Sequence, residues 1–415
     1  MDRLQSLFDE QVKKMASLDE VIYRLISQKL AEHHVRLSPK QINKLKDELR
    51  KLSDADEFTF DVDFSSSQLA KLESLKDVSN GRIIVGFSDD DVEQAVAKFE
   101  RGIQSIIPKI TDDFSRILLK EWRASANSVV VGNRNDLLRF TQTVEKHWGK
   151  ALDSLDALVD LCSDLGSQFN EHNEPEARAA NDPVFSVLTY LHVRACQVGR
   201  EIVVLLRHGF ADGAMARWRT LHEITVTAIF IAQAETDAAE RYIAHVSITD
   251  YKEALQYQQH AASLGFRKLS TKQIQKLKAE KDRLCAIYGS NFAEDYGWAA
   301  KALSRPTPNF ADIEKQVKLE HMRPVYKLAN QNVHAGAKGA VYRLGMPTAD
   351  SSVLVAGSSI FGLQEPGRNT AISISQITTH FLSHEPNLDR LSVVNALREM
   401  MNSTVGAFDK SGSRL

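Results

Sequence analysis

The chain contains few residues that break helices and few that form covalent cross-links. Its 415 residues include 10 prolines, 20 glycines and 3 cysteines. So little proline and glycine argues against a fold rich in turns and favours one built from helices. The cysteines lie far apart in helix-like sequence, with no second cysteine near enough for a metal knuckle or a redox pair. We interpret Cys162, Cys196 and Cys285 as small buried apolar residues.

Neither sign of charge dominates the composition. With 52 Lys and Arg against 54 Asp and Glu, the formal net charge is -2. This balance excludes a global basic field that would hold nucleic acid without regard to sequence. Contact with nucleic acid is therefore expected only at the most basic stretch, residues 267–283. The apolar side of that stretch equally fits an ordinary solvated amphipathic helix.

Long apolar runs are also missing. The longest one, residues 228–234, is far shorter than the roughly 20 residues that a membrane span needs. The first residues carry an acid at Asp2 and lack the basic and apolar regions of a signal peptide. The sequence thus predicts a soluble cytoplasmic protein without a membrane partner.

The spacing of apolar residues predicts a nearly all-α protein, a multi-helix bundle with a long helical arm and a small N-terminal module. The module begins with a helix from Leu4 to about Leu30, and a second helix starts at Ser38, where Ser-Pro-Lys-Gln forms a cap. Alternation of apolar and polar residues over 58–64 predicts a strand that pairs with residues 81–87.

The arm is expected to begin where Ser88-Asp-Asp-Asp caps a long helix. With a further helix over 135–169, it would form an extended arm or an antiparallel hairpin. The polar segment around Pro175 is interpreted as the main linker. The expected domains are an N-terminal helical module with a hairpin at 1–88, the arm at 89–175 and a C-terminal bundle at 176–415. The arm is the expected surface for a protein partner or for a homo-oligomer.

Apolar periodicity continues through the C-terminal part, without an internal repeat or a sustained heptad. A looser segment at 345–370, rich in glycine, serine and threonine, is expected to hold a short hairpin. Helices are predicted over residues 184–208, 211–234, 236–262, 270–288, 309–333, 370–384 and 388–407.

The helix over 211–234 carries ionisable residues where an apolar helix should have none. Its second half is apolar nearly all round, which is typical of a central helix. Arg219, His222 and Glu223 lie on one stripe of this helix, so burial would require partners for them. Two interpretations stay open: an ion pair that fixes helix register, or a catalytic or binding site.

Further candidate residues follow along the chain. Arg241 and His245 are four residues apart on the next helix, and His334 stands at the end of a later helix. We hypothesise that these groups converge with the stripe on one polar pocket. Arg219, His222, Glu223 and His334 are the catalytic candidates; Arg219, Arg241 and His245 are the candidates for binding an anionic ligand.

Known cofactor and metal patterns are absent from the sequence. His222-Glu223 starts a zinc-protease motif, but Val226 occupies the position of the second histidine. The Glu-x-x-His step of di-iron bundles and the glycine-rich phosphate loops are missing too. No metal and no cofactor is therefore expected.

The spacing from Arg217 to His222 matches that of the helical ribonucleases of the HEPN class. On a continuous helix, however, five residues place the two side chains about 140° apart. They could act together only if the helix began after Arg217 or if a second chain supplied one of them.

Residues from about 185 to 335 resemble an uncharacterised bacterial family, the domain of unknown function 5677. The matching features are LLRHGF and GAMARWRTLHE, Arg241-Tyr242 with His245, Tyr296-Gly-Trp298, and Asn-Val-His334-Ala-Gly. The resemblance implies a helical bundle from accessory or mobile bacterial gene sets, with Arg219, Glu223 and His334 as recurrent polar positions. It implies no catalytic assignment.

Three functional hypotheses follow. The first is a bacterial interaction or sensing component, for example of a stress or phage-defence system. The second is a metal-independent, HEPN-like ribonuclease in which His222 or His334 transfers protons and Arg217 or Arg219 steadies a phosphate. The third is a protein that binds a small anionic ligand through Arg219 and Arg241.

Overall fold

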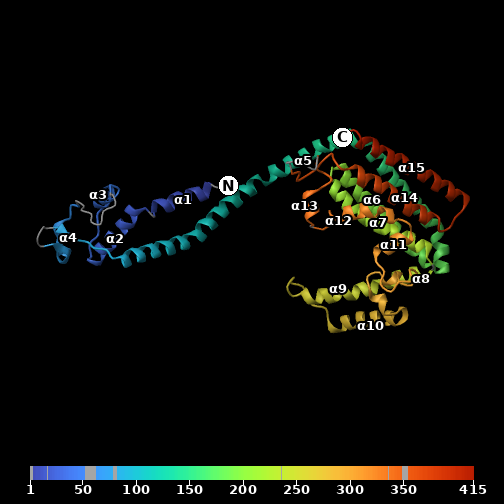
Figure 1. Ribbon diagram of the computed structural model, residues 1–415, viewed down its shortest axis with the longest axis horizontal. Coiled ribbons are helices and arrows are strands. Elements are labelled where there is room, and N and C mark those ends of the chain that lie inside the picture. Colours follow the sequence, from blue (N-terminus) through green and yellow to red (C-terminus); the bar gives the residue numbers. More distant parts are fainter. Residues whose placement is uncertain are drawn as a thin grey trace. The chain divides into compact units, whose positions relative to one another are not determined.

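The computed structural model describes residues 3–15, 17–51, 62–77, 82–234, 236–334, 336–347 and 354–415. They fall into two units, Met1–Val129 and Val130–Leu415, each with its own hydrophobic core. Helices make up most of both units (Figure 1), which confirms the predicted all-α class. The helices are α1 Arg3–Met15, α2 Leu18–Glu32, α3 Pro39–Leu49, α4 Ser66–Lys71, α5 Asp89–Ala180, α6 Pro183–Arg207, α7 Ala211–Gln233, α8 Thr236–Ala244, α9 Val246–His260, α10 Thr271–Tyr288, α11 Phe310–Gln316, α12 Arg323–Asn330, α13 Ala337–Val341, α14 Gln364–Leu382 and α15 Leu388–Gly412.

The first unit is built around α2 and α3. The predicted cap of α3 is confirmed: the Ser38 backbone N–H donates to Gln41 Oε1 at 2.8 Å, and the Gln41 backbone N–H donates to Ser38 Oγ at 3.4 Å. The single helix predicted from Leu4 to Leu30 is instead divided into α1 and α2, because Ser17 adopts an extended conformation before α2. The core contains Ile26, Leu30, Val35, Leu45, Leu49 and Leu72.

The strand pair predicted for this unit is not shown. Residues 52–61, which hold most of the alternating segment, lie outside the described residues, and residues 62–65 have no regular secondary structure. The second predicted strand survives only as β2, Arg82–Ile83, which pairs antiparallel with β1, Lys76–Asp77. Two residues per strand are too few for an independently stable hairpin.

Helix α5 is one element of 92 residues, rather than two helices joined by a turn. Its start is capped as predicted, with the Ser88 backbone N–H donating to Asp91 Oδ2 at 3.0 Å. The helix also continues through Pro175, where a linker was expected. A proline inside a helix costs roughly 3 kcal/mol, but tertiary contacts oppose a break here: Phe169 packs in the core, and Arg390 donates to Asn173 Oδ1 at 3.0 Å. The divisions at residues 88 and 175 remain predictions.

The second unit is a helical bundle with α7 at its centre. Helix α7 packs against α6, α14, α12 and α11, and α15 packs on α14 (Figure 1). Trp218 of α7 is fully buried and donates from Nε1 to Ser373 Oγ at 3.2 Å. Residues Val144 to Phe169 of α5 line the same core. The predicted central position of α7 is thus confirmed.

Two of the predicted bundle helices are interrupted. The segment 236–262 divides into α8 and α9 at His245, and 309–333 divides into α11 and α12. Helix α11 ends because Lys318 has a positive φ of 61°, which an α-helix does not accommodate. The hairpin expected near 353–361 is not shown: residues 348–353 lie outside the described residues, and residues 354–363 contain no strand.

Candidate functional site

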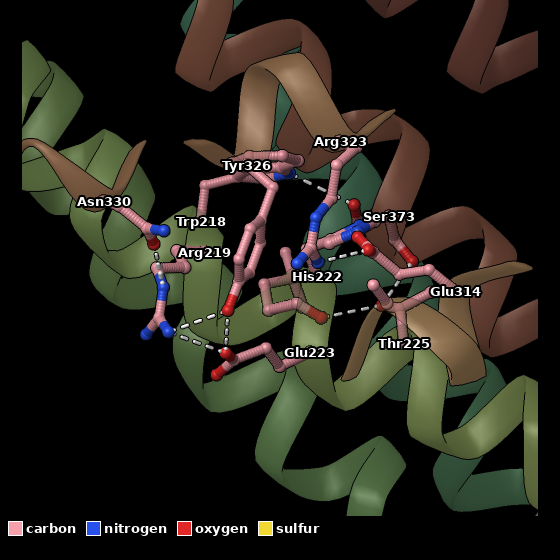
Figure 2. Close-up of polar contacts among 12 residues, drawn as sticks. Trp218, Arg219, His222, Glu223, Thr225, Glu314, Arg323, Tyr326, Asn330 and Ser373 are labelled. Carbon is pink, nitrogen blue, oxygen red and sulfur yellow. Dashed lines mark hydrogen bonds and ion pairs between the residues drawn. The ribbon is translucent and has the colours of Figure 1, made fainter. Parts of the chain in front are cut away.

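The polar stripe on α7 meets two short helices of the same unit. Arg219, His222 and Glu223 face α11 and α12, which contribute four polar partners (Figure 2). We call these seven residues the α7 cluster: Arg219, His222, Glu223, Glu314, Arg323, Tyr326 and Asn330. The cluster confirms the expectation that ionisable groups on this helix need partners.

The outer half of the cluster is centred on Arg219. Its Nη2 lies 3.0 Å from Glu223 Oε1 and donates to Tyr326 Oη at 2.7 Å, while Nε donates to Asn330 Oδ1 at 2.5 Å. The Tyr326 hydroxyl in turn donates to Glu223 Oε1 at 2.5 Å. Arg219 and Glu223 remain 24% and 30% exposed, so this half reaches the solvent.

In the inner half of the cluster, the pair formed by His222 and Glu314 is sealed from solvent, whereas Arg323 is partly exposed. His222 Nε2 lies 3.0 Å from Glu314 Oε1, and these side chains are 1% and 0% exposed. The other carboxylate oxygen of Glu314 accepts from Arg323 Nη1 at 2.5 Å. The His222 ring stacks on Trp218 with centroids 5.2 Å apart. Each carboxylate oxygen of Glu314 therefore has one partner. The His222 side chain is not accessible to a substrate, because almost none of its surface is exposed.

Tyr326 joins the two halves of the cluster. Burial and the hydrogen bond to Glu223 raise the pKa of its phenol well above the usual range, so the hydroxyl stays protonated and donates. The rings of Tyr326 and His222 are 5.9 Å apart. A network in which each polar group is satisfied fixes the register between helices, which supports the structural interpretation over the catalytic one.

Arg217 does not meet His222. Helix α7 begins at Ala211, so both residues stand on one continuous helix. Arg217 Nη2 lies instead 2.5 Å from Glu201 Oε2 on α6. One condition for the ribonuclease hypothesis, a helix that begins after Arg217, is therefore not met.

Arg241 and His245 make their contacts elsewhere in the unit. Arg241 Nε donates to the Trp298 carbonyl oxygen at 3.2 Å, and His245 Nε2 lies 2.8 Å from the Glu294 carbonyl oxygen. Burial lowers the pKa of His245. Neither side chain contacts the α7 cluster within the part of the chain that the structure describes, so these groups do not form the single pocket that the sequence led us to expect.

His334 is exposed, just after α12. Its backbone N–H donates to the Asn330 carbonyl oxygen at 3.0 Å, which ties the turn to the cluster through the backbone. No side-chain hydrogen bond of His334 is found among the described residues. Its catalytic role remains a prediction without a described partner.

Glu314, Arg323 and Tyr326 are members of the cluster that sequence reasoning missed. One signal was available for Glu314: it stands on the same helical face as Phe310, Ile313 and Val317, which are all buried. A carboxylate on an apolar face indicates a buried partner. The sequence gives no comparable signal for Tyr326, because a buried tyrosine is an ordinary core residue.

The basic stretch 267–283 forms most of α10. Arg267, Lys268, Lys272, Lys276, Lys278 and Arg283 are exposed, whereas Leu284 is buried. Arg283 pairs with Glu280 of the same helix, with Nη2 2.7 Å from Oε1. This is the arrangement of a solvated amphipathic helix, and nucleic-acid contact through it remains a prediction.

The described residues contain neither a metal-binding cluster nor a helix that could span a membrane. No group of three His, Cys, Asp or Glu side chains lies close enough together to hold a metal ion. No described helix combines the length and the apolar character needed to cross a membrane.

Comparison with known proteins gives one match. Neither a curated protein nor a solved structure matches the chain. The α7 cluster, Arg241 and His245 all lie within the stretch that does match a family. Residues 185–351 match the sequence model of a family of unknown function (DUF5677), which confirms the resemblance seen in the sequence.

Proposed function

We propose that this protein is an interaction component that works as a dimer of identical chains, joined through α5. The observation that carries the proposal is the number of large apolar side chains that α5 leaves exposed before it enters the core of the second unit. Monomeric proteins rarely expose so many in one continuous stretch. Twelve of them lie between residues 92 and 138: Val92, Val96, Ile106, Ile107, Ile117, Leu119, Trp122, Val129, Val130, Val131, Leu137 and Leu138.

An unaccompanied helix of this composition is not stable in water. Every residue from 119 to 139 is exposed. The run Val129-Val130-Val131-Gly132-Asn133 consists of residues with low helix propensity. Because most helical stability in proteins comes from packing of an apolar face, this stretch requires a partner.

The charges along the helix favour a second copy as that partner. Residues 89–113 contain seven acidic and three basic side chains, whereas residues 114–139 contain two acidic and five basic ones. Antiparallel pairing of two copies places the acidic half of each against the basic half of the other. The resulting interface is isologous, the commonest symmetry of soluble oligomers. Six apolar residues at spacings of four and three lie on one face of this part of the helix: Val92, Val96, Phe99, Ile103, Ile106 and Ile110. Val92, Val96 and Ile106 are exposed and available to a second copy, whereas Phe99 already contacts Arg24 of α2.

The test is the mass of the full chain in solution. We expect sedimentation equilibrium to give a dimer for the wild type. Trp122→Asp should weaken the dimer at least about thirtyfold, because an interface tryptophan commonly contributes 2 kcal/mol or more. Trp122 is 64% exposed and makes no contact in either core, so its replacement leaves the folded units intact.

A matched control distinguishes association through α5 from non-specific association through any exposed aromatic side chain. Tyr190 on α6 is 71% exposed and lies outside α5. Tyr190→Asp should leave the dimer unchanged. A monomeric wild type at the highest measurable concentration, or equal weakening by both substitutions, would refute the proposal.

The ribonuclease hypothesis receives less support from the geometry. Proton transfer by His222 needs access to a substrate, yet its Nε2 lies against Glu314 in a sealed position. The anionic-ligand hypothesis also loses Arg219, whose guanidinium is already bonded to Glu223, Tyr326 and Asn330. Of the other two candidates, His245 contacts the Glu294 carbonyl oxygen through Nε2, and Arg241 is the remaining cation.

A further inference from the structure

We infer that a pocket beside α8, separate from the α7 cluster and from the first half of α5, binds a small molecule that carries a phosphate group. The pocket has a volume of about 430 Å³, and it lies within the second unit. Its polar lining, which we call the α8 pocket, consists of Arg241, Lys301, Arg305, Ser290, Asn291 and Ser304.

The buried cation of the pocket is Arg241. Its side chain is 7% exposed, and its guanidinium lies over the Tyr288 ring, 4.7 Å from the centroid. Nε donates to the Trp298 carbonyl oxygen at 3.2 Å, and Nη2 donates to the Tyr288 carbonyl oxygen at 3.5 Å. Among the described residues, Nη1 has no hydrogen-bond partner. A guanidinium that is oriented in advance loses little entropy when it binds an anion.

No carboxylate is among the described residues that line the α8 pocket. The nearest one to Arg241 is Asp237, whose Oδ2 lies 3.9 Å from Nε and 3.3 Å from Lys301 Nζ. One carboxylate is therefore shared by two cations. Arg305 pairs with Asp312 outside the lining. Three cations line the pocket, and Asp237 and Asp312 pair with them from outside the lining. Three positive charges against two negative ones leave the pocket with a net positive charge of one.

The arrangement suits phosphate better than a single carboxylate. The N–H groups of three cationic side chains and the hydroxyls of Ser290 and Ser304 can donate to the several acceptor oxygens of a phosphate. The volume falls within the usual range for small-molecule sites. Free phosphate and a phosphate monoester share this chemistry, and the experiment distinguishes them.

The experiment measures the melting temperature of the full chain in inorganic phosphate, in ribose 5-phosphate, and in sodium chloride of equal ionic strength. We expect either phosphate probe to raise the melting temperature above its value in chloride, since a ligand that binds only the folded state stabilises it. A larger shift with ribose 5-phosphate would identify a monoester site, and equal shifts would identify a phosphate site.

Lys301→Gln tests the site without disturbing the fold, because Lys301 is 61% exposed. We expect it to weaken phosphate binding about tenfold or more, the usual effect of removing one charged hydrogen bond. Lys276→Gln, an exposed lysine of α10, is the matched control and should bind as the wild type does. Trp122→Asp should also bind normally, which separates this inference from the dimer.

Two outcomes would overturn the inference. One is a wild-type melting temperature that does not differ between phosphate and chloride. The other is an equal loss of binding in Lys301→Gln and Lys276→Gln, which would show a general effect of charge.

Discussion

Replacing Glu314 by alanine should lower the free energy of unfolding by about 3–5 kcal/mol, the usual result of removing one partner of a buried ion pair. Glu314 is fully buried and accepts from both His222 and Arg323 (Figure 2). Its loss leaves those two groups facing each other without an acceptor and also opens a cavity. The measurement is chemical denaturation of the variant and the wild type near neutral pH.

Two further variants make the Glu314 result specific. Glu320→Ala removes an exposed carboxylate six residues away and should change the free energy of unfolding by less than about 0.5 kcal/mol. Glu314→Gln keeps the shape of the side chain and one acceptor oxygen. The decrease in its free energy of unfolding should therefore lie between the decreases in Glu320→Ala and Glu314→Ala. A loss below about 1 kcal/mol in Glu314→Ala would contradict a structural role for the inner half of the α7 cluster.

The second large effect is a loss of stability on mild acidification, caused by His192. This histidine of α6 is 3% exposed, and its Nε2 lies 3.0 Å from Thr378 Oγ1. Burial lowers its pKa from 6.5 to about 4. In the unfolded chain the ring takes up a proton below pH 6.5, whereas in the folded protein it does so only near pH 4. The unfolded state therefore gains protons first, and stability falls as the pH drops through this window.

The expected size of the His192 effect follows from the shift of its pKa. Each pH unit below 6.5 costs about 1.4 kcal/mol until the folded pKa is reached, so the free energy of unfolding should fall by about 2 kcal/mol between about pH 7 and pH 5. His245 and His380 have pKa values lowered by burial and titrate in the same direction. His192→Gln should therefore remove only the part that belongs to His192.

The comparison between His192→Gln and the wild type decides this prediction. Glutamine can place an amide near the position of Nε2 but does not titrate. The free energy of unfolding of His192→Gln should therefore depend less on pH between about pH 7 and pH 5 than that of the wild type. An identical dependence in both proteins would show that His192 is not the group responsible. Unfolding curves at several pH values, at constant ionic strength, provide the measurement.

His192 and Glu314 are both polar residues that the bundle buries, but the sequence contains different information about their surroundings. His192 lies on the apolar face of α6 among Leu188, Leu191 and Ala195, so its burial follows from local periodicity. The partners of Glu314 are 92 residues away at His222 and nine residues away at Arg323. Spacing along a helix contains no information about contacts between such distant positions.

Local chemistry was enough to predict most of the helices. The caps at Ser38 and Ser88 were read directly from the chain because a cap involves residues only three positions apart. The central position of α7 followed from its apolar second half. Interruptions were predicted poorly: the break at Ser17 and the continuation of α5 through Pro175 depend on what each segment packs against.

The sequence by itself determined the helical class, the long helix that starts at Asp89, and the stripe of ionisable residues on α7. Each of these depends on neighbours within a few turns. Only the tertiary structure decided that His222 is sealed against Glu314, that Arg219 is bonded to Tyr326 and Asn330, and that Arg241 belongs to a different pocket. The physical reason is that burial and pairing of a side chain are set by the helices packed against it, which periodicity along one helix does not identify.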